Sequence, residues 1–436
     1  MNEENRSKVT AFFHKAIRDA CYQIEHYQVG NEVKYEFTFR DHMIIMGVRG
    51  VQALARVNEL LASDDIIGQR FSQNTLKREV QSVLAEIIIE GSNVERIEQK
   101  LDVTIAKLEN NSFSSWTAII PIVNLDLKIP STQIGQVSIK ICTEDTFNDF
   151  KRIIRKNKDI GDDVKRDMTS WPERFYIGQV VAECQVQAVD SEHAYDVAND
   201  MIEHALNILR FYSRGTMHND AYNYRMFIGK IGYIYRSQFR AYRWQNDSGQ
   251  ELAPFKCDFK NTGYFYPYVL DFEVLERINN LHFAKINDIL RNQEDSRENF
   301  EKLLLRAMDL FGSAMNDSVE TSSFLKFIIS LEITLVDSHE PEKGLMAERG
   351  AIILADEYKA RNEIFEEIER LYNLRSEFVH KGINNISDPE ISMVSYIAFG
   401  VIIRLLPWIG RVRTLSELID SLNTIKFSGP PFSEKI

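Results

Sequence analysis

The chain has few cysteines, and their spacing does not support a zinc site or a disulfide framework. The four are Cys21, Cys142, Cys184 and Cys257, which lie far apart and form no Cys-x-x-Cys pair. Zinc sites and disulfide-rich folds both depend on recurrent, closely spaced cysteines. We therefore interpret these cysteines as small core residues, and we expect no metal and no cofactor.

Several enzyme motifs are also missing from the sequence. It contains no glycine-rich phosphate loop, no nucleophile elbow and no His-Glu-x-x-His. Those motifs position a phosphate, a serine nucleophile and a zinc ion, respectively. Any catalysis by this chain has to use a different set of residues.

The chain has no excess of basic residues. It has 52 lysines and arginines against 64 aspartates and glutamates, which gives a net charge of −12. Proteins that coat nucleic acid without sequence preference present broad basic surfaces. This balance weighs against a coating protein, so a nucleic-acid site in this chain has to be local.

Long uninterrupted apolar runs are absent as well. The most apolar stretch is Ile391–Trp408, and Arg404 and Pro407 interrupt it before it reaches the roughly 18 to 20 residues that a membrane span needs. We interpret it as a buried helix that serves the core or a subunit interface. The polar, acidic beginning Met-Asn-Glu-Glu-Asn has no apolar signal core. We expect a cytoplasmic protein without membrane contact.

The length of 436 residues is enough for two or three domains with their own cores. Residues 1–111 carry helical patterns at Met43–Ala62 and Leu76–Glu90, separated by the turn-forming Ser63-Asp-Asp. Residues 275–428 read as helical almost throughout. Both regions are therefore predicted to be helical.

Residues 112–274 differ, because runs of β-branched and aromatic residues predict strands there. The predicted strands are Ser115–Ile129, Gln136–Thr143, Phe175–Val189, Tyr222–Tyr235 and Gly263–Val274. A helix capped by Asp190-Ser191 and closed by Gly215 separates the third from the fourth. The predicted fold class is mainly α with an α+β middle region: N-terminal helices, a central α+β domain and a C-terminal all-helical bundle.

Aromatic and basic residues alternate between Tyr222 and Trp244, where Arg225, Arg236 and others separate the rings. Such a pattern can stack bases and hold phosphates. Alternating strands give the same pattern simply by burying rings and exposing arginines, and we favour that interpretation.

The most informative segment is Leu371-Tyr-Asn-Leu-Arg-Ser-Glu-Phe-Val-His-Lys-Gly382, which places Arg375 and His380 near the end of a helix that Gly382 stops. A histidine transfers protons near neutral pH, and a guanidinium holds phosphate charge. Attack of a 2′-hydroxyl on a phosphodiester needs both. The two residues lie about 140° apart around one helix, so two copies across a two-fold axis are expected to complete a cleft. Ser376, one turn before His380, can orient the imidazole.

A second Arg-x4-His match, Arg277-Ile-Asn-Asn-Leu-His282, shows that the spacing alone is a weak signal. It continues into Phe283-Ala-Lys-Ile without a stop residue. We interpret it as an ordinary amphipathic helix with a partly buried histidine.

Context favours the later match. The ordered set Ser330-Leu-Glu332, Glu348-Arg-Gly-Ala351 and Leu371 to Gly382 resembles the HEPN superfamily, most closely its ApeA-like branch, over roughly residues 320 to 425. The resemblance implies an all-helical domain that dimerises and commonly acts as a metal-independent ribonuclease in bacterial anti-phage, abortive-infection or toxin systems. It also implies that Arg375 and His380 are the catalytic pair. Ser376 departs from the Asn, Asp or His that often follows this arginine, and many relatives have lost activity.

These observations predict an endoribonuclease that cuts RNA, with tRNA among the candidate substrates, as a homodimer or higher oligomer built through the C-terminal domain. Residues 1–274 are expected to receive a phage-derived trigger or a regulatory partner. Lys381, Arg404, Arg411 and Arg413 are candidate RNA contacts or merely solvated charges, and Glu332 supports the site or pairs with Arg349. The alternative is a non-catalytic module that dimerises and binds a partner.

Overall fold

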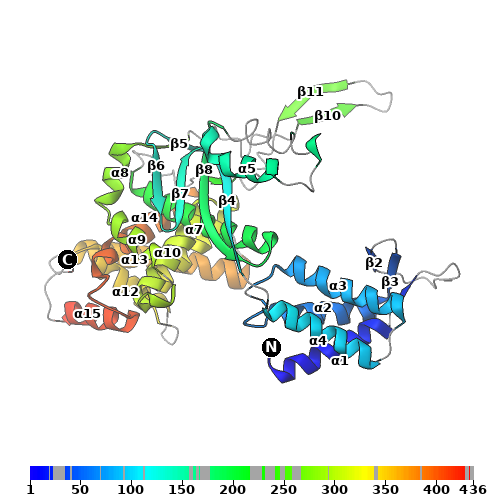
Figure 1. Ribbon diagram of the computed structural model, residues 1–436. Coiled ribbons are helices and arrows are strands. Elements are labelled where there is room, and N and C mark those ends of the chain that lie inside the picture. The colour runs from blue at the N-terminus through cyan, green and yellow to red at the C-terminus, as the bar shows by residue number, and fades with distance from the viewer. Residues whose placement is uncertain are drawn as a thin grey trace. The chain divides into compact units, whose positions relative to one another are not determined.

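The computed structural model describes residues 1–18, 20–22, 35–39, 42–68, 70–91, 94–110, 113–156, 161–163, 166, 177–216, 228–230, 241–245, 251–257, 267–292, 294–337, 342–382, 385–427 and 432. They form two compact units, coloured along the chain in Figure 1. The first unit comprises Met1–Ala118 and Gln185–Asp200, and the second comprises Ile119–Cys184 and Met201–Ile436. The division into three domains at residues 111 and 274 stays a prediction.

The first unit is mainly helical, with a small antiparallel sheet in the order β1-β3-β2. Its elements are α1 (Glu3–Arg18), β1 (Ala20–Tyr22), β2 (Tyr35–Phe39), β3 (His42–Met46), α2 (Val48–Ala62), α3 (Gln73–Glu90) and α4 (Val94–Asn110). One apolar face of each helix supplies the core, which includes Phe13, Val57, Leu84 and Leu101. The predicted helix at Leu76–Glu90 lies within α3 and is confirmed.

The prediction of one helix over Met43–Ala62 is partly wrong. Met43–Met46 belongs to β3, which pairs with both β1 and β2, and α2 begins only at Val48 after Gly47. Ile44, Ile45 and Met46 are buried, so this short apolar run suits a buried strand. The Ser63-Asp-Asp turn is confirmed, because the Asp64 carboxylate accepts the N–H groups of Ile66 and Ile67.

A five-stranded sheet in the order β6-β7-β8-β4-β9 belongs mostly to the second unit. Its strands are β4 (Ser114–Val123), β6 (Ser131–Ile134), β7 (Val137–Ile141), β8 (Val180–Ala188) and β9 (Gly229–Lys230). A parallel pair joins β5 (Leu125–Leu127) to β12 (Tyr268–Leu270), and a hairpin joins β10 (Ala241–Gln245) to β11 (Glu251–Cys257). The helical segments η1 (Glu144–Phe147) and α5 (Asn148–Lys156) follow β7. The strand predictions at Ser115–Ile129, Gln136–Thr143 and Phe175–Val189 each contain one or two of these strands.

The long helix α7 (Ser191–Thr216) follows β8. Asp190 caps it as predicted, since its Oδ1 accepts the N–H groups of Glu192 and His193 at 2.9 and 2.8 Å. Gly215 does not close the helix, which continues to Thr216. A side chain at Gly215 would meet Phe399 at 2.7 Å and Leu281 at 2.8 Å, so this glycine provides room for packing.

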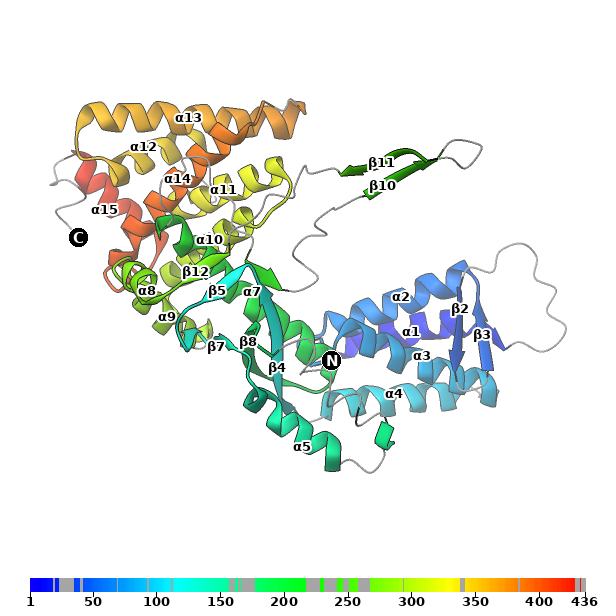
Figure 2. The ribbon, with the colours of Figure 1, turned by 90° about the horizontal axis from the view of Figure 1, so that it is seen from above.

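The rest of the second unit is a helical bundle, seen from above in Figure 2. Its elements are α8 (Phe272–Asn279), α9 (Phe283–Arg291), η2 (Glu294–Ser296), α10 (Asn299–Met315), α11 (Glu320–Leu335), α12 (Glu342–Leu354), α13 (Tyr358–Lys381), α14 (Asp388–Leu405), η3 (Leu406–Trp408) and α15 (Leu415–Phe427). Helix α11 packs against α10 and α14, and α12 packs along α13. The predicted fold class, mainly α with an α+β middle region, is confirmed.

Two predictions at the start of this bundle are wrong in detail. The strand predicted for Gly263–Val274 is limited among the described residues to Tyr268–Leu270, because Asp271 caps α8 by accepting the N–H of Val274 at 2.8 Å. The helix predicted to run through Arg277–His282 breaks after Asn279. His282 adopts a positive φ of 64° and α9 starts at the next residue.

The apolar stretch Ile391–Trp408 forms α14 and η3, and it is buried as predicted. The segment Asp388–Trp408 is long and apolar enough to cross a membrane, but 61% of its most apolar window is buried within the protein. Trp408 stacks on Phe432, with ring centroids 5.2 Å apart. Its composition therefore fits the core helix of this bundle.

Some predictions fall largely outside the described residues. The aromatic and basic alternation between Tyr222 and Trp244 is one of them, together with most of the strand predicted at Tyr222–Tyr235. Within that strand, the structure describes residues 228–230, of which β9 is part.

Candidate functional site

The predicted site lies at the C-terminal end of α13, a helix of 24 residues. Gly382 adopts the left-handed conformation with φ of 68°, and its N–H donates to the carbonyl of Phe378 at 3.1 Å. Glycine reaches this conformation without steric cost and satisfies carbonyls that the helix end leaves unpaired. The predicted helix stop at Gly382 is confirmed, and it places His380 and Lys381 in the final turn.

Arg375 is partly buried and lies against an aromatic ring. Its guanidinium carbon is 5.4 Å from the centroid of the Tyr372 ring, one turn earlier, and Tyr372 itself is 9% exposed. A cation over a ring face is attracted by the negative charge of that face. Tyr372 therefore restricts the orientations of the Arg375 guanidinium.

His380 is exposed near the end of the same helix, and Ser376 is half-buried one turn before it. His380 follows Arg375 by five positions, which corresponds to roughly 7.5 Å along the axis and a rotation of about 140°. Within the part of the chain that the structure describes, no side-chain hydrogen bond or ion pair joins any two of these three residues. A single α13 helix therefore does not bring the arginine and the histidine together.

The N-terminal part of α14 is fixed against the same helix by ion pairs. Arg370 contacts Glu367 at 2.7 Å and Glu390 of α14 at 3.2 Å, and Ser387 also donates to Glu390. The hydrogen bonds that Arg370 donates to the Glu367 carboxylate raise the pKa of Arg370, although burial opposes this effect. The Arg370–Glu390 ion pair thus joins α14 to α13, the helix that carries Arg375.

The four basic residues proposed as RNA contacts differ in their exposure and in their contacts. Lys381 is exposed beside His380, 3.8 Å from Glu377. Arg404 is half-buried and donates to the carbonyl of Ile353 at 2.9 Å, near the C-terminal end of α12. Arg411 and Arg413 are exposed in the connection between η3 and α15. Lys381 is the basic residue adjacent to the motif, and Arg404 has a structural contact.

Glu332 is half-buried near the end of α11, and its carbonyl accepts the N–H of Val336 at 3.0 Å. Arg349, buried on α12, donates to the carbonyl of Leu335 at 2.6 Å. This bond satisfies a terminal carbonyl of α11 and gives Arg349 a structural role. A catalytic contribution of Glu332 stays a prediction.

The competing match at Arg277 and His282 has a different local structure. Arg277 lies in α8, whereas His282 lies in the break before α9. Burial and the nearby Lys285 lower the pKa of His282. Arg277 and His282 do not share a helix, and the His282 side chain is exposed, with part of it desolvated by its neighbours.

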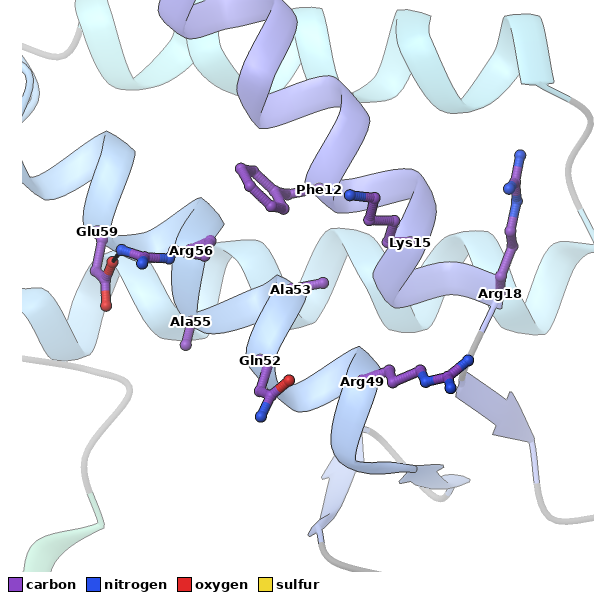
Figure 3. A pocket seen from close by; sticks show the side chains of 9 residues that line it. All are labelled: Phe12, Lys15, Arg18, Arg49, Gln52, Ala53, Ala55, Arg56 and Glu59. Atoms are coloured by element: carbon purple, nitrogen blue, oxygen red, sulfur yellow. Dashed lines mark hydrogen bonds and ion pairs between the residues drawn. The ribbon is translucent and has the colours of Figure 1, made fainter.

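A basic groove that the sequence analysis did not single out lies between α1 and α2 of the first unit (Figure 3). Arg18, Arg49 and Arg56 line it, and the Lys15 ammonium lies 5.0 Å from the centroid of the Phe12 ring. Glu59 forms an ion pair with Arg56. These side chains come from two helices, so no single sequence motif could identify the groove.

Among the residues that the structure describes, no group of three or more His, Cys, Asp or Glu side chains gathers in an arrangement that could hold a metal ion. Burial raises the pKa of the Cys184 thiol to about 11. Cys142 and Cys184 are buried, in agreement with their interpretation as core residues.

Comparison with known proteins gave no assignment. No family model matches the chain, and neither a curated protein nor a solved structure matches it.

Proposed function

We propose that this chain is a metal-independent endoribonuclease, of the HEPN type that its sequence resembles, with Arg375 and His380 as the catalytic residues. The observation that carries the proposal is the end of α13. There an exposed imidazole lies in the last turn before Gly382, and a guanidinium oriented by Tyr372 lies on the same helix.

In this reaction His380 accepts the proton of an RNA 2′-hydroxyl as the 2′-oxygen attacks the adjacent phosphorus. Arg375 stabilises the charge that builds on the phosphoryl oxygens. The new bond joins the 2′-oxygen to phosphorus, the bond to the 5′-oxygen breaks, and that oxygen leaves as a hydroxyl with the proton that His380 returns. The products are a 2′,3′-cyclic phosphate and a 5′-hydroxyl, and Ser376 orients the imidazole.

Because Arg375 and His380 diverge on one helix, the proposal includes a homodimer in which each cleft uses both chains. Residues 1–274 would then restrain or direct cleavage in response to a trigger, as expected for an anti-phage or toxin system. The substrate is RNA, with tRNA among the candidates, and the site of action is the cytoplasm.

The decisive experiment incubates the purified full chain with total RNA and tRNA, beside Arg375→Ala and His380→Ala variants. Both variants should lose cleavage by at least roughly 100-fold, the usual scale for removing an acid–base group or an electrostatic stabiliser. Lys359→Ala, which removes another exposed cation from α13, is the matched control and should cleave normally. Arg277→Ala and His282→Ala should also retain cleavage.

The products and the metal requirement test the chemistry itself. Cleavage should continue in excess chelator, leave 2′,3′-cyclic phosphate ends and fail when the sugar at the cut position is 2′-deoxy. Chelator-sensitive cleavage that leaves 5′-phosphate ends would falsify the mechanism. Binding or dimerisation without any RNA cleavage would instead support the alternative, a non-catalytic interaction module.

A further inference from the structure

The groove between α1 and α2 of the first unit has a surplus of positive charge. It encloses about 900 Å³, and its charged lining consists of Lys15, Arg18, Arg49 and Arg56 against the single carboxylate of Glu59. The chain as a whole has a net charge of −12, so the sign of this local charge is opposite to that of the protein. A cleft lined by one sign of charge concentrates ligands of the other sign.

Three of the groove cations have no partner in the part of the first unit that the structure describes. Lys15, Arg18 and Arg49 are exposed, and their side chains form no hydrogen bond or ion pair with the described residues. Arg6, earlier on α1, differs from them because it pairs with Asp102 of α4 at 3.0 Å. The unpaired cations of α1 and α2 therefore gather on the side of the helices that borders the groove.

The groove is built on a packed helix pair. Phe13 and Ala16 of α1 and Val57 of α2 are buried in one core, which fixes the two helices against each other. The wall on α2 includes Ala53 and Ala55, whose short side chains leave space between the longer cationic ones. The hollow thus exists before any ligand arrives.

An aromatic ring holds one of the cations beside the hollow. The Lys15 ammonium lies 5.0 Å from the centroid of the Phe12 ring, and Phe12 is half-buried one turn earlier on α1. The ring face attracts the cation and limits the directions that the long lysine side chain takes. Lys15 therefore contributes a positive charge on the α1 side of the groove, as Figure 3 shows.

The cations are distributed along the groove rather than gathered at one point. Arg49 and Arg56 are seven positions apart on α2, which corresponds to roughly 10 Å along the helix axis. Figure 3 shows Arg56 at one end of the groove and Arg18 and Arg49 at the other. A single phosphate group cannot contact both ends, whereas a chain of phosphates can extend from one end to the other.

The carboxylate of Glu59 does not oppose such a chain. Glu59 forms an ion pair with Arg56, one turn earlier on α2, so the two charges compensate each other at that end of the groove. The remaining three cations provide the net positive charge.

We propose that the groove between α1 and α2 binds a single strand of RNA, with Lys15, Arg18 and Arg49 contacting its phosphates. Surfaces that bind single strands use a positively charged groove that follows the backbone. The axes of packed helices lie roughly 8–10 Å apart, so the space between two neighbouring helices admits one strand and is too narrow for a double helix. The choice of RNA as the polyanion rests on the proposed function, because the bound strand belongs to the RNA that is cleaved.

Fluorescence anisotropy of the full chain with a labelled 2′-O-methyl oligouridylate tests the proposal. This strand lacks the 2′-hydroxyl that attacks phosphorus, so it reports binding without cleavage. It should bind, and its affinity should fall as salt is added, because phosphate contacts release counterions. The same strand annealed to its complement should bind at least roughly tenfold more weakly, because the groove follows one backbone.

The groove variant Lys15→Ala/Arg18→Ala/Arg49→Ala should lose at least about tenfold in affinity for the single strand. Its plot of log affinity against log salt should also become shallower by about 2, because each phosphate contact to a single strand contributes about 0.7 to the slope. All three side chains are exposed, so thermal unfolding should show a folded chain.

The matched control is Lys8→Ala/Arg96→Ala/Lys107→Ala. It removes the same charge from the first unit, but these cations pair with carboxylates and do not line the groove. The control should keep the affinity and the salt dependence of the unchanged chain.

Equal affinities of the groove variant and the control, an unchanged salt slope in the groove variant, equal binding of the duplex, or no binding of the strand by the unchanged chain would overturn the proposal. The binding assay does not depend on cleavage. Binding through the groove without any RNA cleavage would refute the proposed function alone, and RNA cleavage by a chain that does not bind through the groove would refute this inference alone.

Discussion

The Arg375 guanidinium lies over the ring of Tyr372, one turn earlier on α13, with 5.4 Å between the guanidinium carbon and the ring centroid. If Arg375 acts on RNA, the ring contributes by holding its side chain in one orientation. A cation–π contact at a partly exposed site contributes about 0.5–1 kcal/mol.

Replacing the ring should therefore reduce RNA cleavage by a small factor. Tyr372→Leu should lower the cleavage rate by about two- to fivefold, the rate equivalent of that contact energy. Tyr372→Phe keeps the ring face and is the matched control, with a rate close to that of the unchanged chain. Equal rates for the leucine and phenylalanine variants would show that the ring does not position the arginine.

Complementation between two inactive chains tests the composite cleft. A mixture of Arg375→Ala and His380→Ala chains should recover part of the cleavage activity, because a heterodimer contains one cleft with both residues intact. The two chains are mixed under conditions that allow exchange, and exchange is verified with differently tagged copies. An active monomer in light scattering would contradict the dimer requirement.

Most of α14 is buried within its own chain, but Met393 and Tyr396 are 42% and 67% exposed. These are the positions on α14 where a subunit contact is expected. Tyr396→Asp should weaken dimerisation, measured as the concentration dependence of mass by light scattering. It should change the melting temperature of the chain little, because the side chain is largely exposed. A dimer of unchanged affinity would exclude this face of α14.

Gly312→Ala should strongly destabilise the second unit. The added Cβ would lie 2.1 Å from the backbone oxygen of Asn207, and a backbone atom at a helix crossing cannot move aside cheaply. Overpacking of this kind costs about 1–3 kcal/mol and sometimes more. Gly344→Ala in α12 is the control, because nothing lies within 4 Å of its Cβ position. It should stabilise by up to about 1 kcal/mol through helix propensity, and urea unfolding distinguishes the two outcomes.

The lowered pKa of the Asp317 carboxyl group predicts that the stability of the chain depends on pH. Burial would raise the pKa of its carboxyl group, but hydrogen bonds from Lys326, Ser322 and the N–H of Val319 outweigh it and lower the pKa from 3.8. A carboxyl with a lowered pKa contributes stability above its unfolded-state pKa, and the contribution is lost as pH falls through the folded-state value. Asp317→Asn should therefore destabilise the chain at pH 7, with a smaller difference below about pH 4. A difference that stays constant across this range would contradict the prediction.

Much of the fold follows from local patterns in the sequence. The apolar period of α3, the Asp190 cap of α7 and the Gly382 stop of α13 each depend on residues within a few positions of one another. Capping and glycine conformation are short-range effects, so they act before distant segments meet. The sequence by itself therefore determined the mainly helical class and the end of the helix that carries Arg375 and His380.

Local patterns failed where a distant partner decided the outcome. The run Met43–Met46 has helical spacing with its neighbours, but pairing with β1 and β2 makes it a strand. His282 continues an apparent helix, yet in the structure it has a positive φ and separates α8 from α9. The sequence predicts a helix stop at Gly215. In the structure this glycine instead leaves room for the side chains of Phe399 and Leu281.

The tertiary structure alone revealed the contact between His204 and Asp309, which lie 105 positions apart in the chain. No spacing rule connects such residues. His204 and Asp309 lie on α7 and α10, which cross closely at Gly312, so their contact does not follow from the period of either helix. The Arg375 and His380 motif was readable from the sequence because one helix contains both residues.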